Sequence, residues 1–421
     1  MIQKLRNQKF DLWFSIHTTV MKETFLNDTT FSILIAGDMV PTQSNQELFV
    51  KGDMSSLLGD SLYEAFQKAD ISSLNLECPL TTSDTPIEKN GPNLRALPET
   101  INGIKALNPT VVGLSNNHIL DYGEKGLSDT LSLLSENGIP FVGVGNNLSE
   151  AVQSIHVVEK KGWRIGFYAC AEHEFSIATE ESPGANPFDA LVTGDVVKSL
   201  KDEYQLDILI VLYHGGKEYY QYPSPGLQKV SRYLVEKGAN LVVCQHSHCI
   251  GAYEHYQDGD IVYGQGNFIF DMKHPLSKQS LLLAYELQKG KQPVLSFIPI
   301  KCKDDKSGTV CTAEGEEKKV ILDGLKKRSE EVLLQGVIDR KYAEFSKTMV
   351  YSYLSILSPF GKWFSRFDRY IFKGRLIKWL YPKRKLLVLQ NIVECEAHSE
   401  LLCKGIAIAS MNDDSRSPKK S

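Results

Sequence analysis

Short apolar runs, rich in β-branched residues, alternate along the chain with longer amphipathic segments. Runs of about four to eight apolar residues, bounded by polar residues or glycine, are typical of buried strands. The predicted strands are residues 31–37, 70–76, 110–115, 140–145, 207–213 and 240–245.

The segments between these strands have helical spacing. In residues 124–137, Leu127, Leu131 and Leu134 fall on one face, and the pattern stops at a glycine. Residues 225–238 have a similar pattern that also ends at glycine. Strands that alternate with helices predict a largely parallel, buried sheet covered by helices.

Two stretches depart from this alternation. Residues 154–171 and 281–302 each contain two apolar runs joined by a Lys-Gly turn, which predicts antiparallel hairpins. A parallel core with added antiparallel pairs predicts an α/β fold in which two mixed β-sheets pack together, flanked by helices.

Changes in composition along the chain predict its organisation. An N-terminal extension precedes a main domain, and a charge-rich connector with a helix leads to a basic, aromatic helical tail and a disordered end. The predicted boundaries are 1–30, 31–302, 303–347, 348–411 and 412–421.

The bulk composition is that of an ordinary globular protein. The 421 residues are 42% hydrophobic and 23% charged, with a net charge of −4, which argues against a disordered chain and against nucleic acid as a partner. The eight cysteines form no C-x-x-C pair and are expected to be reduced. Residues 1–25 lack the apolar core of a secretory signal, and no later run reaches the ~18 apolar residues of a membrane span, so we expect a cytoplasmic protein.

Polar side chains with metal-binding chemistry follow the predicted strands. In open α/β sheets, ligands bind outside the carboxyl ends of the strands, so these side chains are expected to meet in one crevice. They are Asp38, Glu77, Asn117, His118, His214, His246 and His248. His246 and His248 point to the same side if the strand stays extended there.

Taken singly, each of these residues has an ordinary structural explanation. Asp38 and Asn117 suit turns, and a lone His214 is more often a hydrogen-bonded buried histidine than a metal ligand. Together they suit a pair of divalent ions, since carboxylate, amide and imidazole groups fit Mn, Fe or Zn. Glu77 is the best candidate to bridge two ions, and His118, beside Asn117, fits an acid that protonates a leaving alkoxide.

Eight segments carry a resemblance to a known family. They are "AGDM" (36–39), "NLECPLT" (75–81), "GPNLRA" (91–96), "LSNNHILDYGEKGLSDTLSLL" (114–134), "VGVGNN" (142–147), "LYHGGKEYYQYPSP" (212–225), "GANLVVCQHSH" (238–248) and "VYGQGNFIFD" (262–271). In this order they resemble the capsule-synthesis CapA (poly-γ-glutamate) family, within the calcineurin-like metallophosphoesterases. The resemblance covers roughly residues 31–275.

The resemblance implies a layered sandwich of two mixed sheets and a site that binds two divalent metals. It implies metal ligands at Asp38, Glu77, Asn117, His214, His246 and His248. His118 would be the acid that does not bind metal, and Arg95, Glu218 and Asn267 would contact substrate or support the ligands.

The sequence departs from general phosphoesterases of this fold at the first strand. Those enzymes carry Asp-x-His there, whereas this chain has Asp38-Met39-Val40, so one imidazole is missing. The bridging position is Glu77 where those enzymes have aspartate. Both changes are usual for the CapA branch.

The tail has a composition of its own. Residues 362–385 contain nine Lys or Arg, one acidic residue and seven aromatics. Such a segment suits an anionic membrane surface, at the inner face of the membrane. It equally suits a helical unit that packs its aromatics on the main domain and leaves its basic face in water. Gly374 and Pro382 are expected to interrupt any long helix.

These features favour a metal-dependent hydrolase acting on a phosphoester or acyl-phosphate. The resemblance implies a role in capsule or cell-envelope polymer production, with a phosphorylated or polymer substrate and the capsule-synthesis machinery as partners. A non-catalytic assembly or polymer-binding subunit at the membrane is the alternative, and the missing imidazole favours it. A nuclease or nucleotidase of the superfamily would need a basic face beside the crevice, but the basic residues gather in the tail.

Overall fold

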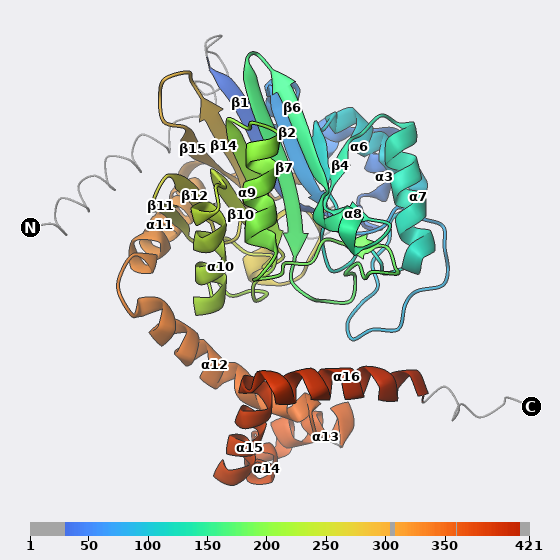
Figure 1. Ribbon diagram of the computed structural model, residues 1–421, viewed down its shortest axis with the longest axis vertical. Coiled ribbons are helices and arrows are strands. Elements are labelled where there is room, and N and C mark those ends of the chain that lie inside the picture. Colours follow the sequence, from blue (N-terminus) through green and yellow to red (C-terminus); the bar gives the residue numbers. More distant parts are fainter. Residues whose placement is uncertain (1–29, 304–307, 359, 413–421) are drawn as a thin grey trace, which may run out of the picture. The chain divides into compact units, whose positions relative to one another are not determined.

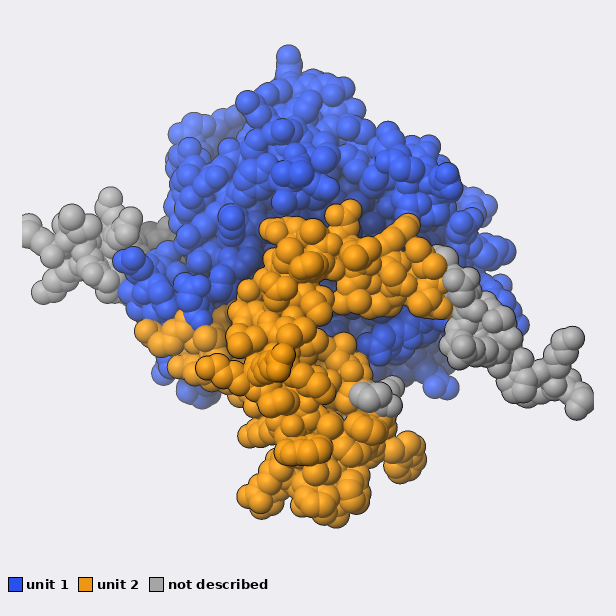
Figure 2. All heavy atoms as spheres, turned by 60° about the horizontal axis from the view of Figure 1, so that its bottom comes forward, with its two compact units in different colours: residues 1–339 blue, residues 340–421 orange. Residues whose placement is uncertain are grey.

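The computed structural model describes residues 30–303, 308–358 and 360–412 (Figure 1). The predicted N-terminal extension up to residue 29 and the predicted disordered end from residue 413 lie outside the described residues. The chain divides into two compact units, residues 1–339 and 340–421, coloured separately in Figure 2.

The first unit contains an eight-stranded mixed sheet in the order β16-β15-β14-β1-β2-β3-β4, with β13 also paired to β1. Strands β1 to β4 run parallel, whereas β14, β15 and β16 form antiparallel pairs. The strands are β1 (Phe31–Met39), β2 (Ile71–Leu76), β3 (Val111–Gly113), β4 (Phe141–Val142), β13 (Asn267–Ile269), β14 (Gln279–Leu287), β15 (Val294–Cys302) and β16 (Val310–Thr312).

A second, six-stranded mixed sheet has the order β11-β12-β10-β9-β7-β6. Its centre is parallel and its two edges are antiparallel pairs. The strands are β6 (Ile155–Lys160), β7 (Trp163–Ala171), β9 (Ile208–His214), β10 (Leu241–Gln245), β11 (Tyr253–Tyr256) and β12 (Gly259–Val262). A small separate sheet pairs β5 (Val144–Gly145) with β8 (Gly184–Ala185).

The two large sheets pack face to face. Alternate residues of β1 face opposite sides: Ile33 and Ile35 join the core that also contains Ile210 and Val243 of the second sheet. Leu34 instead joins the core under the helices of the first sheet. A strand buried on both faces must be apolar at successive positions, and β1 has this composition.

Helices cover the outer faces of both sheets (Figure 1). Those on the eight-stranded sheet are α3 (Gln46–Lys51), α4 (Met54–Leu58), α5 (Asp60–Lys68), α6 (Ile101–Leu107) and α7 (Gly123–Glu136). Those on the six-stranded sheet are α9 (Thr193–Glu203) and α10 (Pro225–Glu236). The short α8 (Leu148–Val152) lies beside β5, and α11 (Gly315–Val332) packs on β11 and β15.

The predicted fold class is confirmed: the first unit is an α/β sandwich of two mixed sheets flanked by helices, and helices follow it at the C-terminal end. Both predicted hairpins are present as β6-β7 and β14-β15. The run 140–145 is not one strand, because the chain turns at Gly143, whose φ of 90° favours glycine. That turn separates β4 from β5.

The second unit is helical. It contains most of α12 (Val337–Ile356), then α13 (Gly361–Phe367), a π-helical turn (Asp368–Phe372), α14 (Arg375–Leu380), α15 (Lys383–Glu394) and α16 (Glu396–Asn412). The predicted interruptions are confirmed, since α14 begins after Gly374 and α15 begins after Pro382. Among the described residues, no helix combines the length and apolarity needed to cross a membrane.

Candidate metal centre

Strands from both sheets deliver the predicted side chains to one place. Asp38 lies near the end of β1, Glu77 directly follows β2, and His214 is the last residue of β9. His246 directly follows β10, and Asn117 lies in the loop after β3. Because β1, β2 and β3 are parallel in one sheet, and β9 and β10 in the other, their carboxyl ends meet at one edge of the sandwich.

The buried side chains form two groups whose ligand atoms lie within 4.8 Å of one another. One group is Glu77, His214 and His246, and the other is Asp38, Glu77 and His248. Glu77 belongs to both: its Oε1 lies 3.3 Å from Nε2 of His214 and 4.0 Å from Nε2 of His248. This is the arrangement that a bridging carboxylate requires.

The Glu77 carboxylate is fully buried, and neither of its oxygens has a hydrogen-bond partner within the described part of the chain. Burial, followed by the nearby Asp38 carboxylate, raises its pKa to about 8. An isolated buried carboxylate is costly unless a cation or donor compensates it. Divalent ions placed between the two groups would supply that compensation, so the residues present fit a pair of metals.

Hydrogen bonds from neighbouring residues hold the Asp38 carboxylate beside Glu77 and His248. Its Oδ1 accepts a hydrogen bond of 2.8 Å from Nδ2 of Asn75, and its Oδ2 accepts one of 3.1 Å from the backbone N–H of His246. Nδ1 of His248 lies 3.6 Å from Oδ2. The contact with His246 joins the ends of the two sheets.

The imidazoles differ in their preferred protonation. Burial lowers the pKa of His214 to about 4. Burial also holds the pKa of His246 well below its ordinary value, and the neighbouring imidazoles of His214 and His248 act in the same direction. Burial also opposes the charged form of His248, but the Glu77 and Asp38 carboxylates outweigh it and raise its pKa. Neutral imidazoles such as His214 and His246 have the free lone pair that a metal ligand needs.

The backbone leaves the extended conformation at His246 and His248. Strand β10 ends at Gln245, and both His246 and His248 adopt left-handed conformations, with φ of 80° and 51°. The condition for strand alternation, an extended backbone, is therefore not met at these two residues. Both rings still converge, with centroids 5.9 Å apart. Left-handed non-glycine residues are costly and cluster at functional sites, where neighbouring contacts hold them.

Asn117 reaches the site through its side-chain oxygen. Its Oδ1 lies 3.0 Å from Nε2 of His214, while its Nδ2 donates to Oε2 of Glu174 at 2.8 Å. The carboxylate of Glu174 therefore fixes the amide so that its oxygen faces His214.

His118 makes a different set of contacts. Its Nδ1 donates to Oδ2 of Asp121 at 2.6 Å, and Nζ of Lys89, 3.2 Å away, is paired with the same aspartate. The backbone N–H of Leu94 also donates to Asp121, at 2.6 Å. Because Nδ1 is engaged, Nε2 is the atom of His118 left to exchange a proton with a substrate.

The three remaining predicted residues occupy different places. Asn267 is buried and its Oδ1 accepts from Nδ1 of His248 at 2.8 Å, so it orients that ring. Glu218 is half-buried in the loop after β9 and contributes to the field at Glu77. Arg95 is exposed: its guanidinium donates to the Ser83 carbonyl and lies 4.8 Å from the Tyr122 ring centroid. Neither of these contacts of Arg95 reaches the metal groups.

Sequence comparison decides the family. The profile described as "Bacterial capsule synthesis protein PGA_cap" matches residues 32–272, more than half of the chain. The chain belongs to this family. The match covers both large sheets up to β13 and every residue of the two candidate metal groups, and it confirms the resemblance predicted from the motifs.

Members of the family with related sequences carry capsule names. The chain is 31% identical over 254 residues to "Capsule biosynthesis protein CapA" of Bacillus anthracis, a match spanning 59% of this chain and 62% of that protein. It is 27% identical over 297 residues to "PGA biosynthesis protein CapA" of Bacillus subtilis (strain 168), spanning 69% and 76%. The match thus covers about three fifths of the length of the B. anthracis relative.

Solved structures are more distant. A hypothetical protein from Thermus thermophilus matches 64% of this chain and 98% of its own at 13% identity, with a TM-score of 0.40. A 5'-nucleotidase precursor from the same organism matches 71% of this chain and 58% of its own at 13% identity, with a TM-score of 0.37. Structural similarity this distant assigns no chemistry to the present chain.

Several residues around this site were missed from sequence alone. Asn75 donates to Asp38, Asn116 donates to Oδ1 of Asn75 at 3.2 Å, and Asp121 holds His118. Asp121 is three positions after His118, a spacing that brings side chains together within a helical turn and could have indicated the pair. Lys89 is distant in sequence and carries no comparable signal.

The buried Glu77 predicts a pH dependence for the metal-free protein. Between the ordinary carboxyl pKa of 4.5 and about 8, the unfolded state has lost this proton while the folded state keeps it. Rising pH therefore favours unfolding over that window, by about 1.4 kcal/mol per pH unit at most, and the loss levels off above it. Glu77→Gln lacks the titrating group.

The comparison is made by urea unfolding of chelator-treated wild type and Glu77→Gln at matched pH values. The difference in unfolding free energy between the two proteins should move in favour of the variant as the pH is raised from 5 to 8. Parallel curves would contradict an uncompensated buried carboxyl at this position.

Proposed function

We propose that this chain is a metal-dependent hydrolase of the family, acting on a phosphoester or acyl-phosphate in the production of a capsule or poly-γ-glutamate-type polymer. The observation that carries the proposal is the buried, unpartnered Glu77 carboxylate common to both ligand groups. A structural polar core has no use for such a carboxylate, because uncompensated burial only destabilises the fold.

Two sets of residues have different proposed roles: one set would bind the metal ions, and the other would transfer a proton. Glu77 would bridge two divalent ions, one of them also bound by His214, His246 and Asn117 and the other by Asp38 and His248. Ions of the Mn, Fe or Zn class suit this mixture of carboxylate, amide and imidazole groups. When bound, such a pair supplies a nucleophile from water at neutral pH and neutralises charge on a phosphoryl group.

His118 supplies the general acid in this proposal. Asp121 accepts from Nδ1, so in the neutral ring Nε2 is the unprotonated nitrogen. As an imidazolium, His118 would carry a second proton on Nε2, give it to a leaving alkoxide and return to the neutral form with its proton on Nδ1. The side chain of Lys89 is buried and forms an ion pair with Asp121. The pair Lys89–Asp121 therefore holds the His118 ring in a fixed orientation.

A non-catalytic assembly subunit is the second candidate, favoured by one observation. The position where related phosphoesterases have histidine is Val40, which is buried and apolar. One ion would then have one imidazole fewer, and a fold with weakened metal binding could serve to position a growing polymer. His118 and its buried aspartate argue for the enzyme, because holding a polymer requires no oriented proton donor.

The deciding experiment combines metal content with turnover. The purified full chain is loaded with Mn, Fe or Zn, its bound metal is counted by mass spectrometry, and hydrolysis of an aryl phosphodiester, an aryl phosphomonoester and acetyl phosphate is measured. We expect about two ions per chain and metal-dependent hydrolysis of at least one ester class. Two bound ions with no hydrolysis of any class would favour the assembly subunit, and no bound metal would reject the hydrolase.

A further inference from the structure

We propose that the helical unit from residue 340 onward is a docking module for an anionic lipid surface, with the basic, aromatic segment 362–385 and the exposed apolar part of α16 as its contact elements. The second unit alone carries this inference, which holds whether or not the metal centre is catalytic. Its partner is a bilayer that contains acidic phospholipid headgroups.

Three aromatic side chains of this segment are strongly exposed to water. Trp363 and Tyr370 are each 82% exposed, and Trp379 is 77% exposed. Large aromatic rings normally bury most of their surface, and exposed tryptophan and tyrosine are the side chains that partition into the headgroup region of a membrane. Three such rings within seventeen residues form a lipid-facing set rather than a packed core.

Nearly all charged side chains of this segment are positive. Residues 362–385 contain nine Lys or Arg and a single acidic residue, Asp368. That carboxylate is buried and accepts hydrogen bonds of 3.0 Å from the backbone N–H groups of Leu376 and Ile377 at the start of α14. Asp368 is thus engaged in capping a helix, and the cations keep their attraction for acidic headgroups.

Three of these cations occupy a position that does not favour the helix itself. The three residues lie in the first turn of α15 and are exposed: Lys383, Arg384 and Lys385. This first turn contains no acidic residue. Positive charge at a helix N-terminus opposes the helix dipole, which prefers acidic side chains there. Local stability therefore does not explain the cluster, whereas an external anionic surface does.

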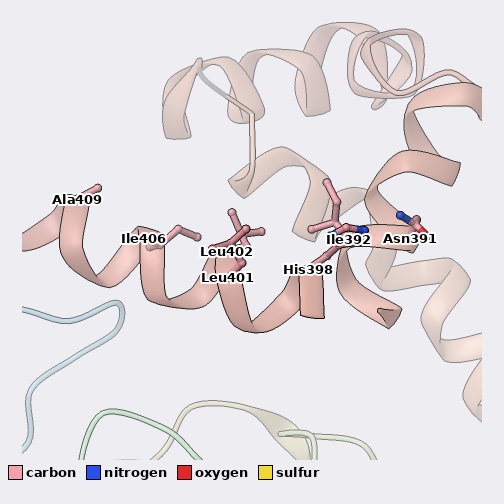
Figure 3. Close-up of a pocket in the computed structure, with 8 residues that line it drawn as sticks. Asn391, Ile392, His398, Leu401, Leu402, Ile406 and Ala409 are labelled. Atoms are coloured by element: carbon pink, nitrogen blue, oxygen red, sulfur yellow. The ribbon is translucent and has the colours of Figure 1, made fainter. Parts of the chain in front are cut away.

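The last helix adds apolar surface to this charge. All ten residues from 401 to 410 are exposed, and Lys404 is the one charged residue among them. Beside them, a groove of about 480 Å³ between α15 and α16 is lined by apolar side chains, including Ile392, Leu402 and Ile406 (Figure 3). Exposed apolar surface on this scale marks an interaction site.

Charge and apolarity together select the lipid. An acidic polymer would match the cations but would leave the tryptophans and α16 in water. A second copy of the chain would cover apolar surface but would bring two strongly cationic segments together. A bilayer with acidic headgroups provides both an anionic plane and an apolar layer beneath it.

The test uses the full chain and sucrose-loaded vesicles of 30% phosphatidylglycerol and 70% phosphatidylcholine. We expect sedimentation with these vesicles, at least about 10-fold weaker binding to pure phosphatidylcholine, and loss of most binding in 0.5 M NaCl. Reversing Lys383, Arg384 and Lys385 to glutamate should lower the partition coefficient by about 100-fold or more. Trp363→Ala with Trp379→Ala should lower it by about 10-fold with the charges intact.

A matched control reverses three exposed lysines of the first unit, Lys105, Lys319 and Lys327, and should bind vesicles as wild type does. Circular dichroism and melting temperature confirm that each variant is folded. Equal binding to acidic and neutral vesicles, equal loss in the control, displacement from vesicles by poly-γ-glutamate at equal charge, or self-association that buries the tryptophans would each overturn the proposal.

Discussion

A His118→Ala variant is expected to keep its bound metal and to lose turnover by about 10²–10⁴-fold, the span of general acid–base assistance. The reason is the separation of roles at the site. His118 is paired through Nδ1 with Asp121 and belongs to neither of the two candidate ligand groups. Its loss would therefore remove the proposed proton donor and leave the candidate metal ligands in place. Metal content and kcat are measured on the same preparation.

The size of the defect should depend on the leaving group. A nitrophenolate leaves without much help from an acid, whereas an alkoxide needs the proton, so His118→Ala should be more damaging with alkyl than with nitrophenyl esters. Asp121→Asn, which keeps the ring but weakens control of its tautomer, should fall between wild type and His118→Ala. An equal defect on both kinds of ester, or loss of metal with His118, would contradict the acid role.

Glu77→Gln is expected to lower the affinity for divalent metal by at least about 100-fold, since even indirect supports of metal ligands are worth 10–100-fold. The same variant should unfold less readily than wild type at pH 8 once metal is removed, because it lacks the uncompensated buried carboxylate. Calorimetric titration with Mn²⁺ measures the first effect and urea unfolding the second.

A second buried carboxylate provides the matched control. Glu254 lies away from the ligand groups, paired with Arg232 at 2.5 Å and accepting from the Tyr263 hydroxyl at 2.6 Å. Glu254→Gln should therefore destabilise the fold and keep metal affinity, the reverse of Glu77→Gln. If both variants lose metal together, the effect comes from general loss of structure and the bridging role of Glu77 is wrong.

The sequence predicted the architecture where pattern and structure share a physical cause. Strands such as Phe31–Met39 and Ile208–His214 are mostly apolar because they lie buried in a two-sheet sandwich. The convergence of Asp38 and Glu77 followed from the rule that parallel strands of one sheet end at the same edge. Both inferences needed only residue types and their order.

What the sequence could not supply depends on tertiary contacts. The left-handed backbone of His246 and His248 gives no local signal, because neighbours such as Asp38 and Asn267 hold it in place. Lys89, which pairs with the Asp121 carboxylate beside His118, was missed for a similar reason, because it lies 32 residues away along the chain. Arg95, singled out by its motif, contacts Ser83 and Tyr122 instead of the metal groups.

We propose that two divalent cations lie on either side of the Glu77 carboxylate. Anomalous diffraction from crystals of the Mn-loaded protein tests it most directly. Two anomalous peaks roughly 3.5–4 Å apart are expected, one beside His214 and His246 and the other beside Asp38 and His248, with Glu77 between them. An absence of peaks at Glu77 in metal-saturated crystals would contradict it.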